Sequence, residues 1–578
     1  FYIDIEPVKD LHIKGNFGLD RLTQKRSTYL PTTTLYGQKM NGQATIAQGD
    51  SNDYLMELTA NYTKTFGDHN LTALLGHSYQ SFHREGFNAG NNDFLLDSFL
   101  YNNLGAGNAD KPTVGSFSNV SKVSSFFARV NYSYKDRYLV AASLRADGSS
   151  NFAEGNRWGY FPSVSLGWRF SEENFMQSLQ NVISNGKLRL SYGQTGNSNV
   201  GNRAMSFYGV GYDNVFGTTT VKGVYLTQLG NPDLTWETSK EWNLGLDLGF
   251  FNNRINMTAE YFHRTVSDLL ATRPLLSYNE VSSIVANSGS TVSQGFELTI
   301  NTNNIRTKNF EWNTDFTLSL YRDDWKSRVD SWVPSAWESY NGPMRYWSGY
   351  LSDGLIQPGE EVPWQEGALP GQVKIKDIDG FVYNEDGSYK VDEHGIPLKT
   401  GKPDGKLDDA DKVIYGRQEP GFMMGFNNTL RWKNFDFNIY FYGEFNKLMN
   451  SNYKNYWVSY NIGDLRRGYN LPTSALNVWS TENPNGTLPG FLQHYSIYGT
   501  ADYYLEKIWF IRCRNITLGY NIPVKTSKHI LSNVRVYVDV NNPFMFTNYG
   551  GLDPEIDSSA KWAYPNVRTY SLGVDITF

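Results

Sequence analysis

Acidic residues at calcium-like spacing lie in two short stretches, KIKDIDG (374–380) and PDGKLDDAD (403–411). Without residues 381–403 the two halves join as D-x-D-G-D-G-x-L-D-x-x-D. Calcium takes about six to eight hard oxygen ligands, and such loops place acids at alternate positions, a glycine at the bend and an acid at the end. The pattern therefore predicts a Ca²⁺ site in the 374–411 loop, although the insertion interrupts it. The other interpretation is a solvated acidic loop. The expected ligands are Asp377, Asp379, Asp404, Asp408 and Asp411, with the carbonyl of Lys406.

Clustered aromatic residues are the second feature that could do chemistry. Flat aromatic faces stack on the C–H faces of sugars, and Tyr and Trp also anchor protein interfaces. Two clusters, at 332–350 and 453–460, lie in long polar stretches and are candidates for ligand contact. Packing within the loops, or an interface with another protein, is the alternative. The candidates for substrate binding are Trp332, Trp337, Tyr346, Trp347, Tyr456 and Trp457.

Catalytic motifs are not visible in the sequence. The eight histidines are scattered, and there is no HExxH, P-loop or GxSxG pattern. We therefore expect a protein that is not an enzyme.

The elements that position these residues are strands. The chain ends in RTYSLGVDITF (568–578), in which apolar side chains from Tyr570 to Phe578 alternate with small or polar ones. Successive side chains of a strand point to opposite faces, so one face is apolar throughout. A barrel in a membrane needs such a closing strand, and Tyr570 and Phe578 would mark its end for assembly. The same alternation recurs along the chain, and about 17 strands fit it.

The connections between the strands are sorted by length. Short turns such as Lys135-Asp136, Asn252-Asn253, Lys433-Asn434 and Gly67-Asp68-His69 alternate with long polar loops. Short turns on one rim and long loops on the other are typical of an outer-membrane β-barrel, whereas a soluble sandwich has no reason for this sorting. The long loops are expected near 25–53, 85–123, 198–236, 267–292, 322–420, 447–505 and 542–567, and a small helix is expected within 171–186.

Bulk composition excludes other classes. The mean hydropathy is −0.49 and no run of about 18 apolar residues exists, which excludes transmembrane helices. The net charge is −6 and no basic face suggests nucleic acid, so we expect no nucleic-acid partner. The first strand, Phe1 to Glu6, would run toward the short-turn rim. Single-chain bacterial barrels have an even strand number with both ends on that rim, so we expect strands upstream and interpret the chain as a C-terminal portion.

Several stretches resemble the SusC/RagA family of TonB-dependent outer-membrane transporters, and the resemblance covers nearly the whole chain in family order. They are YKDRYLVAASLRADGSSNF (134–152), GYFPSVSLGWRFSEENFM (159–176), LRLSYGQTGN (188–197), NPDLTWETSKEWNLGLD (231–247), SQGFELTIN (293–301) and YSLGVDITF (570–578).

The resemblance implies a transmembrane antiparallel barrel of about 22 strands, multi-pass in the outer membrane of a Gram-negative bacterium and surrounded by its lipid. All of residues 1–578 would belong to the barrel. The N-terminal plug, the TonB-contacting segment and the first strands would lie outside these residues. The implied partners are a SusD-like surface lipoprotein and the TonB complex, in a dimer of transporter–lipoprotein pairs. The cargo would be an oligosaccharide or a peptide, and the aromatic-rich loops favour the oligosaccharide. A passive porin-like channel is the alternative.

Overall fold

The computed structural model describes residues 1–108, 110, 112–450, 468, 473–490, 501–523, 532–556 and 564–577. Within these ranges the chain is mostly strand, with a single short α-helix and several 3-10 turns. Seventeen of the strands described there belong to one sheet, and all its resolved registers are antiparallel. The all-β prediction and the expected number of strands are therefore confirmed. No helix in the described part of the chain has the length and apolar character needed to cross a bilayer.

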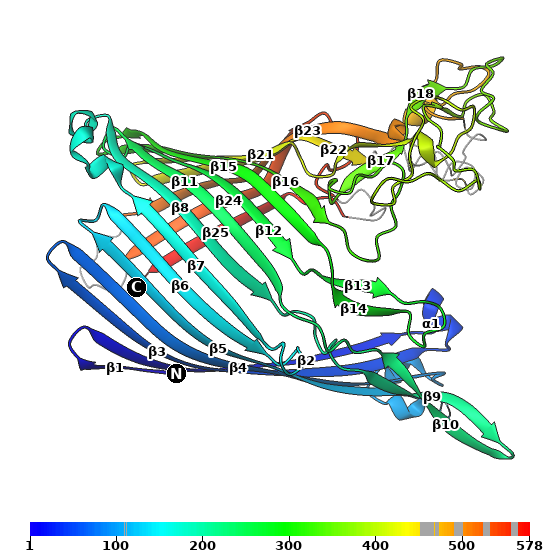
Figure 1. The fold of residues 1–578 in the computed structure, drawn as a ribbon, viewed down its shortest axis with the longest axis horizontal. Helices are drawn as coiled ribbons and strands as arrows, with labels where there is room; N and C mark the ends of the chain where they lie inside the picture. Colours follow the sequence, from blue (N-terminus) through cyan, green and yellow to red (C-terminus); the bar gives the residue numbers. More distant parts are fainter. Residues whose placement is uncertain are drawn as a thin grey trace. The chain divides into compact units, whose positions relative to one another are not determined.

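The first of two compact units comprises Phe1–Trp168, Ser191–Glu241 and Val266–Ser288. Strands β1 to β7 pair antiparallel in chain order, as the blue to cyan ribbon of Figure 1 shows. Two hairpins outside the large sheet, β9–β10 and β13–β14, complete the unit. Its elements are β1 (Tyr2–Val8), β2 (Leu11–Leu30), α1 (Leu35–Lys39), β3 (Gln43–Phe66), β4 (His69–Asn92), η1 (Asp97–Phe99), η2 (Leu104–Ala106), β5 (Thr113–Tyr134), β6 (Tyr138–Ser149), β7 (Trp158–Trp168), β9 (Phe207–Phe216), β10 (Thr219–Gln228), β13 (Leu270–Pro274) and β14 (Ser283–Asn287).

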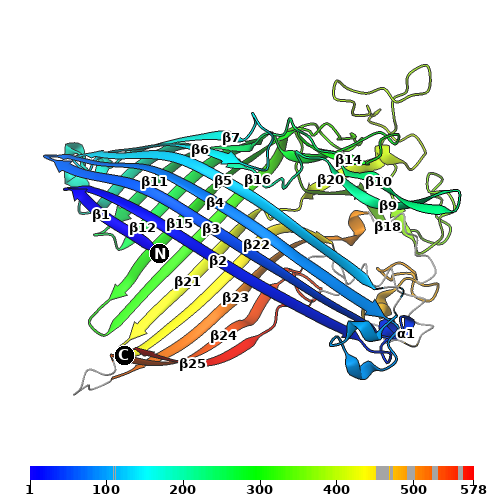
Figure 2. The ribbon, with the colours of Figure 1, turned by 90° about the horizontal axis from the view of Figure 1, so that it is seen from below.

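The second unit comprises Arg169–Leu190, Trp242–Thr265 and Gly289–Phe578. Strands β15, β16, β21, β22, β23, β24 and β25 pair antiparallel in that order, the last of them in yellow to red in Figure 2. Its elements are η3 (Phe170–Glu172), η4 (Asn174–Leu179), β15 (Ser290–Arg306), β16 (Phe310–Ser327), β17 (Tyr346–Tyr350), β18 (Ser352–Leu355), β19 (Val373–Ile375), η5 (Asp409–Asp411), β20 (Lys412–Arg417), β21 (Phe422–Trp432), β22 (Phe435–Asn450), η6 (Thr473–Asn477), η8 (Asp502–Tyr504), β23 (Leu505–Ile522), β24 (Asn533–Thr547) and β25 (Thr569–Thr577). Strands β8 (Ile183–Asn197), β11 (Glu237–Phe250) and β12 (Ile255–Ser267) have residues in both units.

The alternating strands expose their apolar side chains. In the first unit, Met56 and Leu58 on β3 are more than half exposed; in the second unit, so are Tyr570 and Leu572 on β25. A soluble sheet would bury these side chains, and large exposed apolar surfaces mark contact with lipid or another protein. The predicted alternation is therefore confirmed, and it follows the lipid-facing pattern of a membrane strand. Phe578 lies outside the described residues.

The predicted short turns are also present. Lys135 and Asp136 both have positive φ, as does Lys433. Two consecutive positive φ values are typical of the tight turns whose twist matches that of a β-hairpin. The stretch expected to hold a small helix contains η3 and η4, which are 3-10 rather than α-helical.

The loops expected at 25–53 and 85–123 are shorter than predicted. Strand β2 continues to Leu30, and its register with β3 is unbroken to the pair Leu30–Gln43. Strands β4 and β5 likewise pair out to Gly90 and Thr113. These outer parts carry polar side chains on both faces, for example Thr23 donating to Asp50 (2.6 Å), so the apolar alternation that identifies a strand is missing there.

The buried cores of the described residues lie in the outer loops and strand ends rather than beneath the sheet. One is built from Tyr350, Leu355, Val373, Ile375, Trp479 and Ala501, a second from Phe152, Val200 and Leu234, and a third from Met449, Ile508 and Tyr549. Parts of the long loops thus have buried apolar cores of their own.

The close approach of Phe127 to Gly76 gives a test of the strand packing. The two residues are opposite in register on β5 and β4, and a Cβ at position 76 would lie 2.2 Å from the Phe127 ring. The replacement Gly76→Val is therefore expected to lower the free energy of unfolding by about 1–3 kcal/mol through overpacking. Gly15→Val is the control, because nothing lies within 4 Å of a Cβ there. Samples of the purified protein are heated to a series of temperatures and then run on gels without further heating. The measurement is the temperature at which the band of the folded protein disappears. Equal temperatures for the two variants would contradict this packing.

Candidate functional site

The longest described loop joins β16 to β21 and carries most of the predicted site residues. It contains two small sheets, β17 with β20 and β18 with β19. Lys374 on β19 bridges Asp353 (2.7 Å) and Glu360 (2.9 Å). Its charge holds the pKa of both carboxyls below their ordinary values through these hydrogen bonds.

Two of the predicted aromatic residues converge on the carboxylate of Glu338. Trp332 donates its indole N–H to Glu338 Oε2 (3.0 Å), and Tyr346 donates its hydroxyl to Oε1 (2.6 Å). The guanidinium of Arg328 lies 3.7 Å from Glu338 and 4.5 Å from the centre of the Trp332 ring. Burial, followed by the hydrogen bond to Glu338, raises the pKa of Tyr346 to about 12. These rings are fixed by contacts inside the loop.

The other aromatic candidates diverge. Trp347 donates to the carbonyl of Leu448 on β22 (3.1 Å), and the ammonium of Lys412 lies 4.8 Å from the Trp337 ring. Tyr456 and Trp457 lie outside the described residues. Trp332, Trp337 and Tyr346 thus have contacts inside the loop, and Trp347 contacts β22. Ligand contact by the six residues stays a prediction.

The two halves of the acidic motif meet in the structure. Asp377 accepts backbone hydrogen bonds from Asp404 (3.3 Å) and Gly405 (2.7 Å), which lie on the far side of the insertion. Asp379 accepts from the N–H of Gly401 (2.6 Å). The two halves of the motif therefore lie next to each other across the insertion of residues 381–403, as the sequence pattern predicts.

The remaining predicted ligands also accept backbone N–H groups. Asp404 accepts from Lys406 (3.0 Å), and Asp408 caps η5 by accepting from Ala410 (2.8 Å). In the part of the chain that the structure describes, no group of three or more His, Cys, Asp or Glu side chains is arranged to hold a metal ion. The calcium site stays a prediction.

Asp411 is the most buried of these carboxylates. Its Oδ1 accepts from the N–H groups of Ile378 (2.7 Å) and Asp379 (3.2 Å), and its Oδ2 accepts from Asp408 (3.0 Å). Burial raises the pKa of the Asp411 carboxyl, and the three backbone donors oppose that shift. Asp411 therefore ties the first half of the motif to the second.

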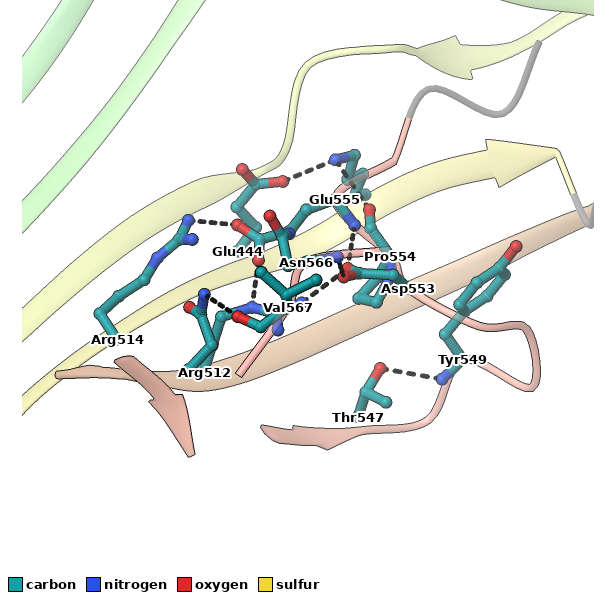
Figure 3. Close-up of polar contacts among 12 residues, drawn as sticks. Glu444, Arg512, Arg514, Thr547, Tyr549, Asp553, Pro554, Glu555, Asn566 and Val567 are labelled. Carbon is teal, nitrogen blue, oxygen red and sulfur yellow. Dashed lines mark hydrogen bonds and ion pairs between the residues drawn. The ribbon is translucent and has the colours of Figure 1, made fainter. Parts of the chain in front are cut away.

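A charged cluster that the sequence reasoning missed fixes the last outer loop to the sheet (Figure 3). Arg512 on β23 donates to Asp553 (2.6 Å) and to Glu555, and Arg514 donates to the other oxygen of Glu555. The side chains of Arg512 and Asp553 are almost fully buried. Because a buried charge is tolerated only when it is paired and hydrogen-bonded, this arrangement specifies where the loop lies. We call Arg512, Arg514, Asp553 and Glu555 the loop clamp.

The clamp depends on an irregularity in β23. Arg514 is an extra residue against β22, where the consecutive residues Tyr440 and Phe441 pair with Asn515 and Cys513. The pairing with β24 shifts at the same place, between Cys513 and Asn515. Bulges re-aim side chains and are frequent next to functional sites. Asp553 in turn accepts from the backbone of Glu555 (3.0 Å) and Asn566 (3.2 Å), so one carboxylate both pairs with Arg512 and holds the loop's turn. In the sequence only the charge-rich strings RCR (512–514) and DPE (553–555) hint at this pairing.

Comparison with known proteins identifies the family. Residues 9–542 match the family described as TonB dependent receptor-like, beta-barrel. The chain belongs to the TonB-dependent receptor family. It is a β-barrel chain of the outer membrane of Gram-negative bacteria.

Individual relatives place it in the SusC/RagA group. It is similar to TonB-dependent receptor P3 of Formosa agariphila, with 32% identity over 100% of this chain and 57% of that protein. It is 31% identical to TonB-dependent receptor SusC of Bacteroides thetaiotaomicron, over 92% of this chain and 51% of that protein. The structure of the RagAB peptide transporter superposes with a TM-score of 0.81 at 23% identity, over 100% of this chain and 61% of that one. The chain thus spans little more than half the length of the curated relatives it matches.

The loop clamp yields a prediction. Replacing Arg512 by Gln leaves Asp553 and Glu555 buried with one cation fewer, and breaking a buried pair in this way costs about 3–5 kcal/mol. We expect the backbone amides of Glu555 and Asn566 to exchange with deuterium faster than in the unmodified protein.

The control for this prediction is Arg306→Gln, because Arg306 is exposed at the end of β15. Hydrogen–deuterium exchange read by mass spectrometry makes the measurement, with peptides from β24 as an internal reference. Unchanged exchange at Glu555 and Asn566 in the Arg512 variant would show that the clamp does not hold the loop.

Proposed function

We propose that the protein imports a bulky nutrient across the outer membrane by TonB-dependent transport. The match to the receptor-barrel family over residues 9–542 carries this proposal. Exposed apolar strand faces and folded outer loops support it, because such a barrel presents a wall to lipid and a binding surface to the outside. The plug and the TonB-contacting segment are proposed to belong to the rest of the full-length protein.

A SusD-like surface lipoprotein is the proposed partner, in a dimer of transporter–lipoprotein pairs. The two-stranded ribbon β9–β10 supports such a partner. Val210 and Val224 pair across it, and both side chains are about two thirds exposed (67% and 70%). An isolated two-stranded hairpin is at best marginally stable in water, and exposed apolar groups of this kind mark interaction sites. We propose that the lipoprotein covers this ribbon.

For the cargo we propose an oligosaccharide. The support is the density of Trp and Tyr in the long outer loops, since aromatic faces stack on sugars. The structure ties Trp332 and Tyr346 to Glu338, so any sugar would meet rings that are already held in place. The name of the RagAB transporter refers to peptides, and that likeness concerns the fold, so peptide is an outcome of the test rather than the proposal.

The test is to purify the full-length protein from outer membranes and identify what accompanies it. A stoichiometric surface lipoprotein is expected, and its binding to panels of oligosaccharides and peptides would identify the cargo. A lone barrel that conducts ions steadily in a planar bilayer would instead show a porin-like channel and end the TonB-coupled proposal.

The ribbon yields a prediction of its own. Val224→Asp places a charge on the exposed apolar surface of β10 and is expected to reduce the lipoprotein recovered with the transporter at least severalfold. Burying an unpaired charge at an interface is costly. The matched control is Val333→Asp in the β16–β21 loop, where the valine is even more exposed (81%). The measurement is the ratio of the two proteins after affinity purification, and loss of the partner in both variants or in neither would refute this docking surface.

A further inference from the structure

The acidic motif carries an internal cation that its calcium-like pattern does not anticipate. Residues 381–399 fold back on themselves, with bridges between Phe381 and Lys399, Tyr383 and Tyr389, and Val391 and Pro397. The inserted segment therefore leaves the motif and returns to it at Lys399. A contiguous calcium loop has no such residue at its centre.

The ammonium of Lys399 is held by the end of the motif. It donates to the carbonyl of Ala410 (2.6 Å) and to that of Lys412 (2.9 Å). These two carbonyls flank Asp411, whose side chain is fully buried. Both partners of Lys399 are thus fixed backbone groups beside a buried carboxylate, and the half-buried ammonium points inward rather than to solvent.

Burial lowers the pKa of the Lys399 ammonium, and the negative charges of Asp379, Asp411, Asp408 and Asp409 oppose that shift by favouring its charged form. The nearby Lys412 is paired at 2.6 Å with Asp409 on a more exposed part of the loop. Lys399 is therefore the cation placed to offset the carboxylates that surround η5.

Several carboxylate oxygens of the motif already accept backbone hydrogen bonds. Both oxygens of Asp411 accept backbone N–H groups, and Asp377 receives two more from the second half of the motif. A carboxylate that accepts two or three backbone N–H bonds is stabilised as an anion without a metal. What the loop still requires is positive charge inside it, since a buried carboxylate is costly when unpaired.

We propose that Lys399, brought in by the insertion, takes the place of the calcium ion in this motif, so that the acidic loop folds without metal. The insertion and the lysine belong together, because the hairpins of residues 381–399 are what deliver the ammonium to Ala410 and Lys412. This inference concerns the loop alone and is independent of the cargo and of the lipoprotein.

The first arm of the test needs no variant. Hydrogen–deuterium exchange at Ile378, Asp379 and Asp408, the donors to Asp411, is measured on the full-length protein with a calcium chelator and then with excess Ca²⁺. Equal protection in the two conditions is expected. Protection that falls in the chelator would overturn the proposal and establish the calcium site.

The second arm compares Lys399→Met with Lys390→Met. Lys390 lies in the same insertion with an exposed side chain. Removing Lys399 is expected to speed exchange at the three donor amides about tenfold or more, the scale of losing a charged hydrogen bond, and Lys399→Arg should restore part of the protection. Peptides from β24 and β25 report that the sheet is intact. Equal exchange in the two methionine variants would overturn the proposal.

Discussion

The rest of this structure depends on one constraint: backbone groups must be hydrogen-bonded where no water is available. Within hydrocarbon every N–H and C=O must find a partner inside the protein, which leaves the paired strand as the unit of construction. The registers from β1 to β7 in one unit and from β15 to β25 in the other meet this demand strand by strand. Once the backbone is satisfied in this way, the side chains are free to be apolar toward lipid, as Met56 and Leu572 are.

Because the sheet exposes its apolar side chains, apolar groups are buried in other parts of the protein. A soluble sheet is stabilised by a core beneath it, whereas here the buried clusters of the described residues lie at the outer ends and in the loops, around residues such as Ile375 and Trp479. Polar side chains on the sheet instead bond to one another. Arg189, for example, bridges Asp247 (2.8 Å) and Glu260 (2.6 Å), all within the second unit. The three side chains thereby fix one another's positions on the sheet.

Sequence reasoning succeeded where a short-range periodicity reports the environment. The alternation around Met56 and along Thr569–Thr577 identified the strands, and the dipeptides at Lys135 and Lys433 identified the turns. It failed where that signal is absent. The outer parts of β2 to β5 carry polar side chains on both faces, so no apolar alternation distinguishes them from loops. It also failed for contacts between distant residues. Arg512 and Asp553 are 41 positions apart, and no local pattern links them. The adjacency of Asp377 and Asp404 was found only because the two fragments complete one another.

The loop clamp and the acidic loop share a physical logic. Each uses buried charge where an apolar contact would stabilise the fold at lower cost, since replacing buried ion pairs by hydrophobic groups is often neutral or stabilising. The buried pair of Arg512 and Asp553 thus serves to fix the position of the loop rather than to stabilise the fold. An ion pair with hydrogen-bond geometry has one favourable arrangement, whereas two apolar surfaces can pack in many. The same holds for Asp411, whose three backbone donors come from both halves of one motif. In a molecule whose sheet supplies stability through its backbone, the long loops can use buried charge to fix their own shape.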